Sequence, residues 1–144
     1  MNIFKPEEME KQPRADMYLP MWLLVFGFLL DAMSLASLVI AIVAQNWFFL
    51  IAVLGLGLLG IAAFLCWKNQ TIKIIDEFRF EYTTFLGQKR VYYFSDIKEL
   101  RPNADSWTLI LNNGKVHIES IVCISDKLVE AISASVECNE DSIQ

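Results

Sequence analysis

The stretch that decides the fold runs from Met21 to Trp67 and reads MWLLVFGFLLDAMSLASLVIAIVAQNWFFLIAVLGLGLLGIAAFLCW. It contains a single charged side chain, that of Asp31, whereas the 77 residues that follow it contain 21 charges. The whole chain has 144 residues, of which 55% are hydrophobic. This separation of apolar from charged sequence excludes an ordinary soluble globule and predicts a small membrane protein with one polar domain attached.

Two segments of this stretch are long enough to cross a bilayer, which requires about 20 apolar residues in a helix. Residues 21–44 contain one charge, Asp31, and residues 47–67 contain none. The polar pair Gln45-Asn46 lies between them and can close a tight turn. We therefore expect a membrane-spanning helical hairpin within residues 17–68, with spans at 21–44 and 47–67.

The distribution of Lys and Arg predicts how the hairpin is oriented. Basic residues lie before the first span and after the second, whereas the connecting turn has none. Because basic residues are enriched on the cytoplasmic side, we expect a multi-pass protein of the cell membrane with both termini cytoplasmic. A cleaved signal peptide is the alternative, but the apolar run begins after 20 residues and a second span follows it at once. The basic residues are Lys5, Lys11 and Arg14 before the hairpin and Lys68, Lys73 and Arg79 after it.

Asp31 is the hairpin residue with the greatest chemical consequence. Folding at the turn places Asp31 level with Gly60 and Ser34 level with Gly57. A charge near the bilayer centre costs at least ~2.5 to 3.5 kcal/mol, so we expect Asp31 to be protonated, hydrogen-bonded to a neighbour such as Ser34, or paired with a Lys or Arg of another protein. We assign these four residues to helix packing or partner docking. Proton or ion handling is an alternative, as is a shorter helix that leaves Asp31 near an interface.

The glycines Gly55, Gly57 and Gly60 match the G-x-G-x-x-G dinucleotide fingerprint. A Rossmann unit needs an amphipathic helix after the glycines and crossover helices further on. Here the sequence after the glycines is apolar on every side, and short strand patterns follow it. We therefore expect no nucleotide cofactor, and interpret the glycines as sites of close helix approach.

After the hairpin, the hydrophobic period changes to two, which is typical of strands. Residues 1–16 are predicted to be a disordered cytoplasmic tail, residues 69–136 a cytoplasmic domain and residues 137–144 an acidic C-terminal tail. A closing helix is expected from Asp126 to about Val136, capped by Ser125, with Leu128, Val129, Ile132 and Val136 on one apolar face. The six expected strands lie within residues 71–75, 78–84, 90–94, 97–101, 107–111 and 115–118.

The run from Ile74 to Leu100 contains an acidic turn, an aromatic strand, a turn at Gly87 and the segment Tyr93-Phe94-Ser95-Asp96-Ile97. With the preceding hairpin, this arrangement resembles the small bacterial membrane proteins that carry a pleckstrin-homology-like (PH-like) domain, over roughly residues 17–135. The resemblance implies a membrane α-helical hairpin plus an α+β domain, in which an antiparallel PH-like sheet or partial barrel is capped by one C-terminal helix. A full PH barrel has seven strands, whereas six are placed here.

Lipid-binding members of the PH class grip phosphorylated headgroups with a basic pocket around the first hairpin. This chain has Asp76 and Glu77 there, so the resemblance does not imply a specific phosphoinositide site. Four basic residues can still form a cationic edge near anionic lipid, although surface solvation also explains them. They are Lys73, Arg79, Lys89 and Arg90.

No residue pattern points to catalysis, a metal or a cofactor. His117 is the only histidine, and the cysteines Cys66, Cys123 and Cys138 are far apart in sequence. A net charge of −5 and the lack of a long basic cluster exclude a nucleic-acid binder that works by bulk charge. We therefore expect a non-enzymatic protein that binds neither nucleic acid nor nucleotide.

The expected function is that of a membrane-anchored module that recruits or regulates a protein partner at the cytoplasmic membrane face. Its partners are then the lipid bilayer and either another protein or a second copy of the chain. One alternative is an accessory subunit of a transporter or channel that docks through Asp31. Another is a sensor of anionic lipid.

Overall fold

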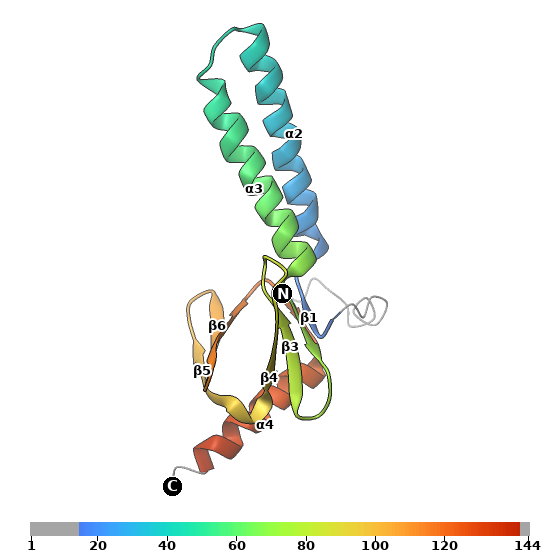
Figure 1. The fold of residues 1–144 in the computed structure, drawn as a ribbon, viewed down its shortest axis with the longest axis vertical. Coiled ribbons are helices and arrows are strands. Elements are labelled where there is room, and N and C mark those ends of the chain that lie inside the picture. Colours follow the sequence, from blue (N-terminus) through green and yellow to red (C-terminus); the bar gives the residue numbers. More distant parts are fainter. Residues whose placement is uncertain (1–14, 142–144) are drawn as a thin grey trace.

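The computed structural model describes residues 15–141, which form a two-helix rod joined to a β-rich domain (Figure 1). The helices α2 and α3 extend from one end of this domain, and the helix α4 packs at the other end. The elements in chain order are β1 (Met17–Tyr18), α2 (Met21–Val43), α3 (Phe49–Asn69), β2 (Thr71–Ile74), β3 (Arg79–Thr83), β4 (Lys89–Tyr93), the 3-10 helix η1 (Phe94–Asp96), β5 (Ile97–Pro102), β6 (Ser106–Leu111), β7 (Gly114–Glu119), β8 (Cys123–Ile124) and α4 (Asp126–Asp141).

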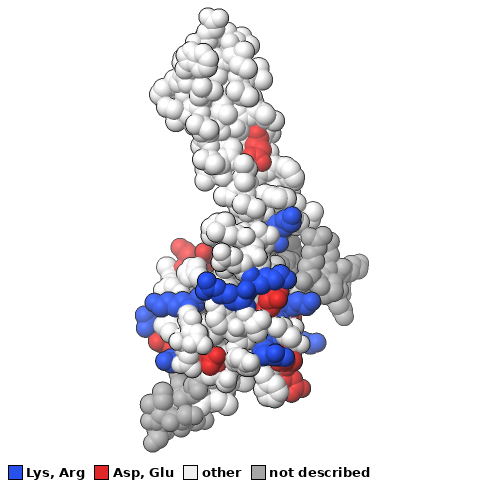
Figure 2. Space-filling view, viewed as in Figure 1, with Lys and Arg blue, Asp and Glu red and all other residues white. Residues whose placement is uncertain are grey.

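Both helices of the rod are long and apolar enough to cross a bilayer. In an apolar stretch of 18 residues within each helix, only 11% is buried in α2 and 6% in α3. The core helix of a soluble protein, by contrast, is mostly buried. Figure 2 shows the rod as an uncharged surface interrupted by one acidic side chain, and places nearly all other charges on the β domain. The apolar side chains of the rod therefore need an apolar surrounding.

The turn between the helices forms where the sequence predicted it. Gln45 adopts a φ of 48°, and the Asn46 side chain accepts a hydrogen bond from the Phe48 N–H at 3.1 Å. This turn extends over Trp47 and Phe48, so α3 begins at Phe49 and not at Trp47 as expected. The helical hairpin itself is confirmed.

The domain contains two antiparallel sheets. One has five strands in the order β4-β3-β2-β1-β8, and the other has three in the order β5-β6-β7. All six expected strands are present, and β1 and β8 are two further strands of two residues each. Within residues 15–141 the sheets do not close into a barrel, so the α+β layout is confirmed and the PH-like barrel is not.

Both ends of the hairpin continue into neighbouring strands of the same sheet. The strand β1 leads into α2 through Leu19 and Pro20, both buried, and α3 passes into β2 through Gln70 alone. These two strands pair with each other, with Met17 opposite Ile72. Because no flexible linker intervenes, the orientation of the hairpin is tied to that of the sheet.

The core lies between the two sheets and α4. Its centre is aromatic: the Phe80 ring lies 5.8 Å from that of Tyr92 and 5.0 Å from that of Phe94, centroid to centroid. The helix α4 adds Leu128 and Ile132, which are both buried. Phe78, at the start of the strand predicted at 78–84, precedes β3, and 70% of its surface is exposed.

The structure extends the domain past two of its expected boundaries. Of the tail predicted at residues 1–16, residues 1–14 lie outside the described part of the chain. Asp16 is described, and it belongs to the domain. Its carboxylate accepts hydrogen bonds from the Ile74 N–H at 2.7 Å and the Ser125 hydroxyl at 3.2 Å. These contacts join the start of β1 to β2 and to the beginning of α4.

The helix α4 also differs from its prediction at one end. It begins at Asp126, and the Ser125 hydroxyl accepts a hydrogen bond from the Leu128 N–H at 3.3 Å, as a cap does. It continues to Asp141 and so includes part of the predicted acidic tail at 137–144. Val129, which was expected on the apolar face, is 41% exposed because the face in contact with the core is narrower than predicted.

Replacing Phe80 by Ala should lower the free energy of unfolding by about 3–5 kcal/mol, because it removes a buried ring at the centre of the core. Phe78→Ala is the matched control and should change it by no more than about 0.5 kcal/mol, because that ring is mostly exposed. Urea unfolding of the full chain in detergent micelles, followed by near-ultraviolet circular dichroism, measures both. Equal losses in the two variants would contradict this account of the core.

Candidate functional site

The interface between α2 and α3 is built from small residues. Gly27, Ser34 and Ala41 are the buried residues of α2 and recur at every seventh position, which places them on one face. The Ser34 hydroxyl donates a hydrogen bond across the interface to the Val53 carbonyl at 2.8 Å. A Cβ on Gly57 would lie 3.2 Å from the same hydroxyl, so Ser34 and Gly57 are level, as the turn predicted.

Asp31 lies against Gly60, also at the expected level. A Cβ on Gly60 would collide with the Asp31 carboxylate and would come within 2.9 Å of the Gly27 carbonyl oxygen. Of the three states expected for Asp31, a hydrogen bond from Ser34 is not formed, since Ser34 donates to Val53 instead. Asp31 is half-buried, and within the described part of the hairpin nothing donates a hydrogen bond to its carboxylate.

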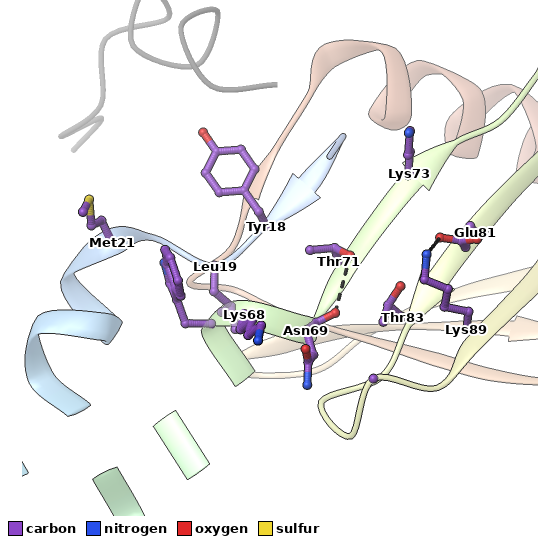
Figure 3. A pocket seen from close by; sticks show the side chains of 12 residues that line it. Tyr18, Leu19, Met21, Lys68, Asn69, Thr71, Lys73, Glu81, Thr83 and Lys89 are labelled. Atoms are coloured by element: carbon purple, nitrogen blue, oxygen red, sulfur yellow. Dashed lines mark hydrogen bonds and ion pairs between the residues drawn. The ribbon is translucent and has the colours of Figure 1, made fainter. Parts of the chain in front are cut away.

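A cleft of about 430 Å³ lies where the base of the hairpin meets the five-stranded sheet (Figure 3). The first residue of α2 and the last turn of α3 line one side, and Gly87 of the β3–β4 turn lines another. Alternate residues of β2 and β3 and Lys89 of β4 line the face of the sheet, because successive side chains of a strand point to opposite faces, and Tyr18 and Leu19 complete the cleft. The cleft therefore has an apolar wall from the hairpin and a polar wall from the sheet.

The β3–β4 turn is attached to the end of α3. The Asn69 side chain donates a hydrogen bond to the Phe85 carbonyl at 2.8 Å. Gly87 adopts a φ of +81°, and a Cβ there would lie 3.5 Å from the Asn69 amide nitrogen. Glycine suits this position because other residues rarely adopt that backbone conformation. The contact sets the position of one wall of the cleft.

Three lysines and one glutamate contribute the ionised side chains of the cleft. The Lys89 ammonium lies 3.1 Å from a Glu81 carboxylate oxygen, which neutralises one positive charge (Figure 3). The Lys68 ammonium lies 6.0 Å from the centre of the Phe64 ring. Among residues 15–141, neither Lys68 nor Lys73 has an acidic partner within 4.0 Å, so the cleft has a net positive charge.

Tyr18 also lines the cleft, and burial, followed by the nearby Cys123, raises the pKa of its phenol above the ordinary value of 10.0. The phenol is therefore neutral at physiological pH. It adds no negative charge to that of Glu81.

The structure divides the four residues of the predicted cationic edge. It brings Lys73 and Lys89 together in the cleft and leaves Arg79 and Arg90 outside it. The Arg79 guanidinium donates two hydrogen bonds to Asp76, at 2.6 and 2.8 Å, and these hold the pKa of that carboxyl below its usual range. Arg90 is exposed on β4. Lys68 was not part of the predicted edge, although it is basic and directly follows the second predicted span at residues 47–67.

The polar residues His117 and Asp96, outside the cleft, have structural partners. His117 Nδ1 lies 3.1 Å from the Thr108 hydroxyl, and Asp96 accepts a hydrogen bond from the Asn112 side chain at 3.2 Å. Burial raises the pKa of the Cys123 thiol, which lowers its thiolate fraction. In the described part of the chain, no three His, Cys, Asp or Glu residues are grouped to hold a metal ion.

The strand β4 forms one edge of the five-stranded sheet. The Phe94 N–H bonds to Phe78, and the Thr84 N–H bonds to Gln88, so even-numbered residues of β4 bond to β3. Since bonded and non-bonded pairs alternate in an antiparallel ladder, the backbone groups of Lys89, Val91 and Tyr93 point away from the sheet.

The side chains of this edge combine apolar area with positive charge. Val91 and Tyr93 are each 50% exposed. Lys89 and Arg90 are exposed at the end of the strand next to the β3–β4 turn. An edge of this kind is open to pairing with another strand, and the basic end favours an acidic one.

No family model, curated protein or solved structure matches this chain. The comparisons therefore neither support nor contradict the resemblance to PH-like membrane proteins, and that assignment stays a prediction.

Gly60→Ala should destabilise the hairpin by about 1–3 kcal/mol, because the added methyl meets both the Asp31 carboxylate and the Gly27 backbone. Gly55→Ala is the matched control: nothing lies within 4 Å of a Cβ there, so its effect should be neutral or slightly stabilising. The midpoint of unfolding by sodium dodecyl sulfate, followed by far-ultraviolet circular dichroism, separates the two. A Gly55→Ala variant as unstable as Gly60→Ala would refute the observed helix packing.

Proposed function

We propose that this protein is a non-enzymatic, membrane-anchored module that captures a protein partner at the cytoplasmic face of a bacterial membrane. In this proposal α2 and α3 cross the bilayer as a hairpin, both termini are cytoplasmic, and the β domain has a PH-like fold. The partner contributes an extended, acidic segment that pairs with β4 as an additional strand.

The observation that carries the proposal is the rigid connection between the hairpin and a sheet with an open edge. The hairpin enters and leaves the sheet through the paired strands β1 and β2, and β4 is at the edge of that same sheet. A hairpin in the bilayer therefore holds β4 at one height and one orientation. Because the hairpin confines the protein to the membrane, β4 also meets partners in the same membrane at a higher effective concentration.

The chemistry of β4 defines the kind of segment that it accepts. The outward backbone groups of Lys89, Val91 and Tyr93 supply the ladder hydrogen bonds for an added strand. Val91 and Tyr93 supply apolar contact. Arg90 has no acidic residue within 4.0 Å in the described part of the chain, so it is available to an acidic partner. These features favour an extended segment in which apolar and acidic residues alternate.

A second candidate function is docking in a larger transporter or channel assembly. The lack of a hydrogen-bond donor to the Asp31 carboxylate among the described residues favours it. The carboxylate lies within the hairpin. An acidic group at membrane depth normally pairs with a cation or a hydrogen-bond donor. A Lys or Arg in a helix of another subunit supplies that partner.

Val91→Pro should abolish partner capture at β4, because proline removes an outward N–H that the sheet itself does not use. Val91→Ala keeps that N–H and should retain at least about half of the capture. A photo-crosslinking amino acid at position 93, activated in native membranes, measures capture, and mass spectrometry identifies the attached peptide. The expected product is one protein joined through a single acidic, extended segment.

The same crosslinker at position 129, on the exposed face of α4, is the spatial control and should give no such product. Equal yields from Val91→Pro and Val91→Ala would show that β4 does not pair with the partner. Protease digestion of the β domain from outside intact cells would contradict the proposed orientation.

Asp31→Asn separates the second function from the first. If Asp31 docks a partner helix through an ion pair, this variant should reduce copurification of the membrane complex by about tenfold, the effect of losing a charge-assisted hydrogen bond. Capture at β4 should be unchanged, because Asp31 is remote from that strand. Quantitative mass spectrometry of the detergent-extracted complex measures both. Unchanged copurification would eliminate the docking role.

A further inference from the structure

The cleft at the base of the hairpin combines features that point to a ligand. It has about 430 Å³ of space, within the range typical of small-molecule sites. It contains three lysines and one glutamate, and one lysine is neutralised by that glutamate. Its neutral polar groups include Thr71 and Asn69. This set of donors suits a compact anion with several acceptor oxygens, such as a phosphate group.

The position of the cleft along the hairpin restricts the source of the anion. The cleft begins at Met21 and at Trp67, the ends of the two apolar helices. In a bilayer, the headgroup region occupies about 5–8 Å beyond each side of the hydrocarbon core. Lys68, which directly follows Trp67, therefore lies at the level of the lipid phosphates, and Lys73, the third residue of β2, lines the same cleft further into the domain.

The surroundings of the cleft fit a lipid better than a soluble phosphate. The apolar wall formed by Met21 and Trp67 continues along α2, where Trp22 is 50% exposed and Val25 is 62% exposed. On the opposite side, Phe85 and Leu86 of the β3–β4 turn are 48% and 64% exposed beside the end of α3. A ligand whose phosphate occupies the cleft can thus lay its acyl chains along an apolar surface.

We propose that this cleft is a binding site for the phosphate headgroup of one anionic phospholipid, held by Lys68 and Lys73. The second N–H of the Asn69 amide supplies a neutral hydrogen bond, since the first donates to Phe85, and the Thr71 hydroxyl supplies another if it exchanges its 3.4 Å bond to the Asn69 carbonyl for the phosphate. Lys89 stays paired with Glu81. Nonspecific attraction would involve every basic side chain near the membrane. In the proposed site only Lys68 and Lys73 hold the phosphate, because they line the cleft, whereas Arg79 and Arg90 lie outside it. The proposal rests on the membrane insertion of the hairpin and is independent of partner capture at β4.

The test compares two double variants of the full chain that lose the same charge. Lys68→Gln/Lys73→Gln removes the two cleft lysines, and Lys98→Gln/Lys115→Gln removes two exposed lysines that do not line the cleft. Each protein is reconstituted in nanodiscs with an equal mixture of phosphatidylglycerol and phosphatidylcholine. Native mass spectrometry after detergent extraction then counts the phosphatidylglycerol molecules retained.

The unaltered protein should retain one phosphatidylglycerol. The cleft variant should lower its affinity by about fivefold for each lysine lost, or roughly 25-fold in total. The control variant should retain the lipid, and Lys68→Arg/Lys73→Arg should restore it. Circular dichroism of each variant confirms folding before lipid is counted.

Three results would overturn the site. Equal lipid loss from both double variants would indicate attraction by overall charge. Retention of phosphatidylcholine, whose choline neutralises its phosphate, at the same level would show that the site does not select a headgroup with a net negative charge. Displacement of the lipid by 1 mM glycerol phosphate, an excess of about 100-fold over the protein, would assign the cleft to a soluble phosphate compound. Val91→Pro should leave lipid retention unchanged, so failure of the partner-capture proposal is distinguishable from failure of this one.

Discussion

The pairing of β1 with β2 is the constraint on which the rest of the structure depends. Met17 lies opposite Ile72, and each strand continues into one helix of the hairpin after one or two residues. Neighbouring strands are about 4.8 Å apart, whereas packed helices are about 8–10 Å apart. The connections between strands and helices are only one or two residues long, so they cannot separate the helices much further than the strands. This favours close contact between the helices. Gly27 and Gly60 provide that contact because neither has a side chain to separate the two backbones.

The same connection explains why a charged cleft exists at the base of the hairpin. The sheet buries one face against α4 and the second sheet, and its other face carries alternate polar residues of β2, β3 and β4. Where the helices leave the sheet, they overhang this polar face without filling the space above it. Lys73 and Lys89 come from the sheet, and Lys68 comes from the end of α3. The long lysine side chains reach water around the cleft, which avoids the cost of burying their charges.

The domain is completed by local bonds between segments far apart in the sequence. Asp16 bonds to β2 and to the residue before α4, so one carboxylate connects the beginning, middle and end of the domain. Asp76 and Arg79 stabilise the turn between β2 and β3 in a similar way, over only three residues. Basic side chains therefore have two roles here. Arg79 has an internal partner, whereas Lys68 and Lys73 are free of ion pairs among the described residues. Figure 2 shows a band of basic side chains across the β domain below the hairpin.

The sequence by itself determined the hairpin, its turn, the level of Asp31 with Gly60, the six longer strands and the start of α4. Each of these follows from a local pattern: an apolar run of sufficient length, a polar break, an alternation or a cap. Only the tertiary structure decided β1, β8, the role of Asp16 and the grouping of Lys68 with Lys73. A strand of two residues has no periodicity, and it is stable only because a neighbouring strand supplies its hydrogen bonds. A cleft depends on the angle at which helices leave a sheet, which no short stretch of residues encodes.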